Sequence, residues 1–238
     1  MLDELNKHEY VPKQSNCYVI TDPALREIYA AQFCDRIVQH FYMKEIEDIL
    51  ENELVDGCCS CRKGKGNDYA LGLLRKYLIE TSKRGSQDCF FLKIDLSGYF
   101  MSINRKQISN KFLELIKHKY KGKHKELLLY LTPIIFENNP AVNCNYKCDE
   151  KLRQRVPDRR KMNINSNYGM AIGNLTSQAA SNLNLNDLLA RTNSQIGTLK
   201  KYNCRRLILN YAEILKEKVP NLIFFDNEQF KFKHIIHN

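Results

Sequence analysis

The chain has 238 residues, which is enough to bury a full core as one large domain or as two lobes around a cleft. Its 37 Lys and Arg residues outnumber 27 Asp and Glu, and the net charge of +10 favours a polyanionic partner such as nucleic acid. No apolar run approaches the ~20 residues that a membrane span needs, and the N-terminus matches neither a signal peptide nor a lipidation site. We therefore expect a cytoplasmic protein with no membrane segment.

The first third of the chain predicts a hairpin followed by a long helix. Two short apolar pieces, 17–20 and 26–30, flank the turn residues 21–25. From 33 to 50 the apolar residues recur at helical spacing with charges between them, which predicts an amphipathic helix.

A basic, glycine-containing loop is expected at 57–66. We expect Asp68 to cap the helix that follows. The side chains predicted to face inward from that helix are Ala70, Leu73, Leu74, Tyr77 and Leu78.

The second half of the chain predicts one strand and two more helices. The strand ends at Asp95, and helices are expected over 105–120 and 175–189. Residues 137–168 are polar, rich in Asn and interrupted by prolines, so we expect a loop or an irregular hairpin there.

The nine cysteines predict reduced thiols. Their number is odd and no secretion signal accompanies them, which argues against a disulfide framework. Cys58-Cys59-x-Cys61 and Cys144-x3-Cys148 contain ligands that suit zinc. Because the spacings are irregular and the groups lie far apart in sequence, we favour buried or incidental thiols and keep zinc as the alternative.

One carboxylate stands at the end of an apolar strand, with an aromatic residue five positions later. Transfer of a nucleotidyl group uses two divalent ions, and hard oxygen ligands from strand ends hold such ions. Asp95 fits that requirement, although an Asp here could simply cap the turn at Ser97-Gly98. Phe100 could test the sugar of an incoming nucleotide, or it could be an ordinary core aromatic.

A second motif, Ile-Gly-Asn-Leu-Thr-Ser-Gln at 172–178, opens an apolar helical run. Gly173 permits a close approach of the backbone, and the polar residues begin a helix whose N-terminal amides can face a nucleotide. The alternative is an ordinary helix cap.

Together these segments resemble motifs A and B of a reverse transcriptase. The Ile-Gly-x-x-x-Ser-Gln form is similar to the enzymes of diversity-generating retroelements, where most relatives have Gln-Gly-x-x-x-Ser-Pro. The stretches at 22–31, 35–40 and 61–66 look like the fingers segments of the same family, so the likeness covers about residues 17–188. Ala24 and Ala171 depart from it, standing where the family usually has Lys and Pro.

The resemblance implies an α+β right-hand polymerase, with a small antiparallel sheet backed by helices. Its regions would be fingers at 1–88, a palm at 89–189 and a divergent tail at 190–238. Asp95 would be the catalytic metal ligand and Phe100 the steric gate that selects dNTPs. The remaining residues carried over are Gly173, Asn174, Ser177 and Gln178 in the nucleotide and template pocket, and Arg26, Arg36, Arg62, Lys63 and Lys65 on phosphates.

The same resemblance implies Mg²⁺ as cofactor, with Mn²⁺ as the alternative ion. The partners would be an RNA template, a DNA or RNA primer, dNTPs and a small basic accessory protein of the retroelement. The reaction would be error-prone DNA synthesis from a template repeat RNA, and the Ile-Gly motif would relate to misincorporation opposite adenine.

The expected Tyr-x-Asp-Asp hairpin is missing, and no Asp-Asp pair occurs in the chain. One carboxylate cannot offset the repulsion of two dications, so we expect an incomplete polymerase without a thumb. Cys204-Arg205-Arg206-Leu207 can be encoded as TGT CGA CGA CTT, which read one base later gives GTC GAC GAC TT and begins Val-Asp-Asp. We therefore expect a truncation or a displaced frame after motif B. A noncatalytic nucleic-acid-binding remnant is the alternative.

Overall fold

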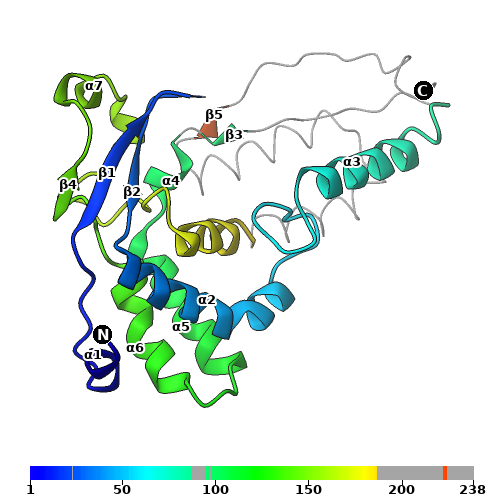
Figure 1. Ribbon diagram of the computed structural model, residues 1–238. Coiled ribbons are helices and arrows are strands. Elements are labelled where there is room, and N and C mark those ends of the chain that lie inside the picture. Colours follow the sequence, from blue (N-terminus) through cyan, green and yellow to red (C-terminus); the bar gives the residue numbers. More distant parts are fainter. Residues whose placement is uncertain (23, 87–94, 97, 187–221, 224–238) are drawn as a thin grey trace. The chain divides into compact units, whose positions relative to one another are not determined.

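The computed structural model describes residues 1–22, 24–86, 95–96, 98–186 and 222–223 (Figure 1). It is an α+β protein with a small mixed sheet. The chain divides into two compact units, one of Met1–Val55 and Gly98–Ala190 and the other of Asp56–Ser97 and Arg191–Asn238. The predicted fingers and palm regions remain predictions, because a compact unit does not identify a lobe.

The first unit contains a three-stranded sheet in the order β2-β1-β4. Strands β1 (Ser15–Ile20) and β2 (Arg26–Ala30) pair antiparallel with Cys17 opposite Tyr29, which confirms the predicted hairpin. Strand β4 (Cys144–Tyr146) runs parallel to β1. The prediction of a purely antiparallel sheet is therefore wrong for this pair. The connection between β1 and β4 is long enough for a crossover, so no hairpin dictates their direction.

Three helices form the main core of this unit. They are α2 (Phe33–Glu53), α5 (Arg105–Lys119) and α6 (Lys125–Phe136), and the first two confirm the predicted helices. Helix α6 was not predicted, although its apolar composition makes most of its surface suitable for burial. The fully buried members of this core, some of them from neighbouring segments, are Val38, Tyr42, Ile46, Ile103, Ile108, Phe112, Ile116, Leu128, Leu131, Phe136 and Ala180.

Shorter elements complete the unit: α1 (Leu2–Asn6), α4 (Tyr99–Ser102), α7 (Glu150–Gln154) and the 3-10 turn η1 (Asp158–Arg160). The predicted last helix is present over its described residues, 175–186 (yellow in Figure 1). The region 137–168 is more ordered than expected, because it contributes β4, α7 and η1. The polar composition of this region gave no helical or alternating pattern from which these short elements could be predicted.

The second unit contains α3 (Asn67–Thr81) and the antiparallel pair β3 (Asp95–Leu96) and β5 (Leu222–Ile223). The predicted helix exists, but its N-cap is Gly66, so the prediction that Asp68 caps it is wrong. No residue of α3 is buried, and Tyr77 is 50% exposed. The helical period showed which face is apolar, but it could not show whether another element covers that face.

Among the helices in the described part of the chain, none is both long and apolar enough to cross a membrane. The proposed displaced motif at Cys204-Arg205-Arg206 lies outside the described residues, as do 187–189 of the last predicted helix.

Candidate functional site

Backbone hydrogen bonds bring the end of motif A, the start of motif B and strand β2 together within the first unit. The amide of Met170 donates to the carbonyl of Phe100 at 2.8 Å, and the amide of Tyr29 donates to the carbonyl of Ile172 at 2.8 Å. Segment 170–172 therefore bridges α4 and the edge of β2. The structure thus places Phe100, Gly173 and the strand that carries Arg26 in one neighbourhood.

Gly173 lies in close contact with β2. Its φ is +120°, in the region that favours glycine. A Cβ at this position would lie 3.0 Å from both Ile28 Cγ2 and the carbonyl oxygen of Tyr29. The predicted close approach of the backbone at Gly173 is therefore present, and it is made to the protein's own strand.

Two polar atoms beside this contact are buried without a hydrogen-bond partner: Nε of Arg26 and Oδ1 of Asn174. Asn174 follows Gly173 directly, and Arg26 shares a face of β2 with Ile28 because side chains alternate along a strand. One atom is a donor and the other an acceptor. Burying such atoms unpaired is costly, so each is a candidate contact for a polar group of a ligand.

The helix 175–186 begins at this point. Thr176 and Ser177 are buried, whereas Gln178 is exposed. The helix is held to α4 by the Tyr99 hydroxyl, which donates to the carbonyl of Ser181 at 2.8 Å. Ser177 thus faces the protein interior and Gln178 faces outward, although both were predicted to line the same pocket.

Phe100 is half-buried and packs against the main core, with its ring at an edge-to-face angle to Tyr99 at 5.8 Å. Phe100 therefore packs in part as the core aromatic that was predicted as the alternative to a steric gate. Its backbone carbonyl, which accepts from Met170, couples α4 to motif B.

Arg105 is a buried residue that the sequence analysis did not single out. Its guanidinium donates to the carbonyls of Tyr168 at 2.8 Å and Gly169 at 3.0 Å, and also to that of Ser166. Burial lowers the pKa of this guanidinium. Arg105 thus anchors the segment that leads into motif B, a role for which the sequence carries no signal.

A basic turn also lies near the site. Gly98, with φ +63°, has no room for a side chain, because its Cβ would lie 2.8 Å from the Arg159 carbonyl oxygen. Arg160 donates to the carbonyl of Leu25 at 3.3 Å, next to Arg26 in sequence. η1 lies in 137–168, for which the sequence predicted a loop or an irregular hairpin.

Arg36 and its neighbour Asp35 differ in environment. Asp35 is buried and accepts from the Tyr10 hydroxyl at 2.6 Å and from the Lys13 amide at 3.0 Å, so it ties the N-terminal segment to α2. Arg36 is exposed, with its guanidinium 5.8 Å from the centre of the Phe33 ring.

The other predicted phosphate-binding residues belong to the second unit. Arg62 is buried and donates to the Cys58 carbonyl at 2.7 Å, while Lys63 is exposed. Lys65 forms an ion pair with Asp56 at 2.7 Å and lowers the pKa of that carboxyl. In this arrangement Arg62 and Lys65 brace their own loop.

Asp95 begins β3, where it pairs with Ile223. Within the ranges described, there is no group of three or more His, Cys, Asp or Glu side chains placed to hold a metal ion. The surroundings of the Asp95 side chain lie outside the described residues, so its role as a ligand for Mg²⁺ stays a prediction.

The described cysteines are free thiols, and burial is the main cause that raises the pKa of Cys17 to about 12.

Known proteins were compared with the chain at the level of families and of single sequences. No family model matches it, and no curated protein matches it either.

Proposed function

We propose that this chain is a reverse transcriptase of the retroelement type, in which the surface formed by Arg26, Gly173 and Asn174 contributes to the binding of a dNTP. The observation that carries the proposal is the pair of buried atoms without partners, Arg26 Nε and Asn174 Oδ1. A nucleotide offers phosphate oxygens to the arginine and hydroxyl or amino donors to the amide oxygen. The sequence likeness to motifs A and B supplies the reaction class.

The other residues take their proposed roles from that likeness. Phe100 gates the sugar, Ser177 and Gln178 shape the nucleotide and template pocket, and Asp95 holds Mg²⁺. When bound, the metal would activate the primer 3′ oxygen and stabilise the leaving pyrophosphate. Arg36, Arg62, Lys63 and Lys65 are proposed to contact phosphates of the nucleotide or the nucleic acid.

A noncatalytic nucleic-acid-binding remnant is the second candidate, and one observation favours it. The sequence contains no Asp-Asp pair to join Asp95 as a carboxylate ligand. Such a protein could retain the nucleotide pocket and the basic surface without polymerising.

The first test measures dATP binding in magnesium buffer by isothermal titration calorimetry. We expect Arg26→Ala to weaken binding by roughly tenfold or more, because a charge-assisted hydrogen bond is lost. Lys106→Ala, which removes an exposed positive charge from α5, serves as the matched control and should bind as wild type does. Absence of dATP binding, or equal losses in both variants, would overturn the proposal.

Primer extension on an RNA template separates the two candidates. A product that needs Mg²⁺ and is lost in Asp95→Asn indicates a polymerase. Nucleotide and RNA binding without any extension indicates the remnant.

A further inference from the structure

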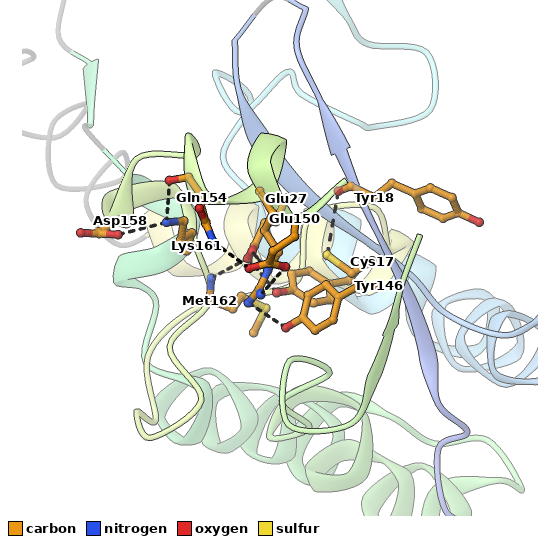
Figure 2. Close-up of polar contacts among 11 residues, drawn as sticks. Cys17, Tyr18, Glu27, Tyr146, Glu150, Gln154, Asp158, Lys161 and Met162 are labelled. Carbon is orange, nitrogen blue, oxygen red and sulfur yellow. Dashed lines mark hydrogen bonds and ion pairs between the residues drawn. The ribbon is translucent and has the colours of Figure 1, made fainter. Parts of the chain in front are cut away.

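Glu27 is a buried carboxylate on the opposite face of β2 from Arg26 and Ile28. It is 1% exposed and accepts hydrogen bonds from three groups. These are Arg153 Nε at 3.2 Å, the Tyr29 hydroxyl at 2.7 Å and the Met162 amide at 3.2 Å. Figure 2 shows Glu27 among these contacts, with Tyr146 and Met162 beside it.

Arg153 comes from α7 and is held from several sides. Its Nη2 donates to the Tyr146 hydroxyl at 3.0 Å, and its guanidinium lies 3.9 Å from the centre of the Tyr146 ring. Its Nη1 lies 3.6 Å from Glu150. The guanidinium is thus fixed in one orientation, with its Nε directed at Glu27.

This cluster connects two parts of the chain that are more than a hundred residues apart. Glu27 and Tyr29 belong to β2, whereas Tyr146, Arg153 and Met162 belong to the segment 144–162. Burial, followed by the hydrogen bond to Glu27, raises the pKa of the Tyr29 hydroxyl, so Tyr29 remains a neutral donor. Three donors from different parts of the chain thus hold the Glu27 carboxylate.

The other side of the same strand forms the candidate nucleotide site. The backbone of Tyr29 donates to Ile172, and Ile28 with the Tyr29 carbonyl would crowd a side chain at Gly173. Arg26 is the immediate neighbour of Glu27. A shift of β2 at Glu27 would therefore move Arg26 and the strand edge on which the 172–174 loop rests.

We propose that Glu27 and Arg153 are positioning residues: the ion pair between the buried Glu27 carboxylate and the partly exposed Arg153 fixes β2 so that Arg26 and the Gly173–Asn174 backbone lie in the geometry that binds a nucleotide. The identity of the ligand in this inference rests on the proposed function. The mechanical part of the inference, that the ion pair fixes the position of β2, does not. Neither residue needs to touch the nucleotide. Both act through β2.

The test uses Arg153→Ala in the full chain, with two measurements. We expect the affinity for dATP to fall by roughly tenfold, as small displacements of binding groups commonly cost. We also expect the amide of Tyr29, which donates to Ile172, to exchange its hydrogen faster than in wild type. Arg153→Lys, which keeps the positive charge, should show a smaller loss of dATP affinity and a smaller increase in the exchange rate of the Tyr29 amide.

The matched control is Arg155→Ala, which removes an exposed positive charge two positions away. It should leave both the affinity and the exchange of the Tyr29 amide unchanged. Equal losses of affinity in Arg153→Ala and Arg155→Ala would mean that only long-range attraction was removed, which would overturn the inference.

The outcomes separate this inference from the proposed function. If wild type binds dATP while Arg153→Ala changes neither measurement, only the inference fails. If wild type does not bind dATP, the proposed function fails, and the exchange of the Tyr29 amide still decides the mechanical part. Should Arg153→Ala not fold, the double variant Glu27→Gln with Arg153→Met replaces it, because no unpaired charge is then buried. The same losses are expected of it.

Discussion

At the scale of single residues, the candidate site depends on one crowded glycine and two polar atoms without a partner. A side chain at Gly173 would be crowded, because the backbone there lies against Ile28 and Tyr29. Arg26 and Asn174 each bury a polar atom that has no hydrogen-bond partner. Arrangements of this kind reduce stability, and this cost is the reason that we propose a ligand for them.

Gly173→Ala tests the cost of this geometry. The new methyl group would meet Tyr29 and Ile28 at 3.0 Å while the backbone remains at φ +120°. We expect the free energy of unfolding to fall by about 1–3 kcal/mol in urea titrations, because both strain and crowding are introduced. Nucleotide affinity should fall as well.

The control for that variant is Gly57→Ala, since a Cβ at Gly57 would meet nothing within 4 Å. Its unfolding free energy should match wild type within about 0.5 kcal/mol. A Gly173→Ala protein as stable as Gly57→Ala would show that the 172–174 loop can leave β2 at no cost.

At the scale of elements, α2, α5 and α6 form the rigid support of the first unit. Phe112 of α5 and Phe136 of α6 stack with ring centres 4.2 Å apart, and Tyr42 of α2 meets both rings at an edge-to-face angle. The buried Tyr42 hydroxyl forms a hydrogen bond with the Thr132 hydroxyl at 2.8 Å, so it has a polar partner within the core. Arg105, at the start of α5, connects these helices to the segment before motif B through its hydrogen bonds to the Tyr168 and Gly169 carbonyls.

Phe112→Ala should destabilise this support severely. Phe112 is fully buried, and removing a buried phenyl ring typically costs about 3–5 kcal/mol of unfolding free energy. The same substitution at Phe33, which is 67% exposed, should change stability by about 0.5 kcal/mol or less. Chemical denaturation of the two variants compares the same chemical change at a buried and an exposed position. Similar losses would contradict the observed packing.

At the scale of the whole molecule, the net charge of +10 favours the binding of a polyanionic partner. A polymerase and a nucleic-acid-binding remnant would both use it, because either must hold a phosphate backbone. The charge therefore supports nucleic-acid binding without choosing between the two functions.

Affinity for single-stranded RNA should fall steeply with salt. If about four phosphates are contacted, the logarithm of the binding constant should fall with the logarithm of salt concentration at a slope near −3. Fluorescence anisotropy with a labelled RNA between low and moderate salt measures this slope. Binding that does not change with salt would contradict phosphate recognition.

Local patterns in the sequence were sufficient for several elements. Alternation and turn residues predicted the β1–β2 hairpin, and helical periodicity predicted α2 and α5. These features depend on neighbours within a few residues, so composition and spacing are enough to specify them. The backbone at Gly173 has the positive φ that glycine accepts freely, whereas its place in a nucleotide pocket stays a prediction.

Other features required the tertiary structure, because they join residues that are distant in the chain. Strand β4 lies parallel to β1 across a long connection, and α3 carries an apolar face that is nowhere fully buried. Glu27 finds Arg153 more than a hundred residues later, and Arg105 binds the carbonyls of 166, 168 and 169. The sequence determined the β1–β2 hairpin and the helices α2, α3 and α5, since these depend on local sterics and periodicity. Only the tertiary structure decided which buried polar atoms are paired and which have no hydrogen-bond partner, because that depends on contacts between segments that no local pattern encodes.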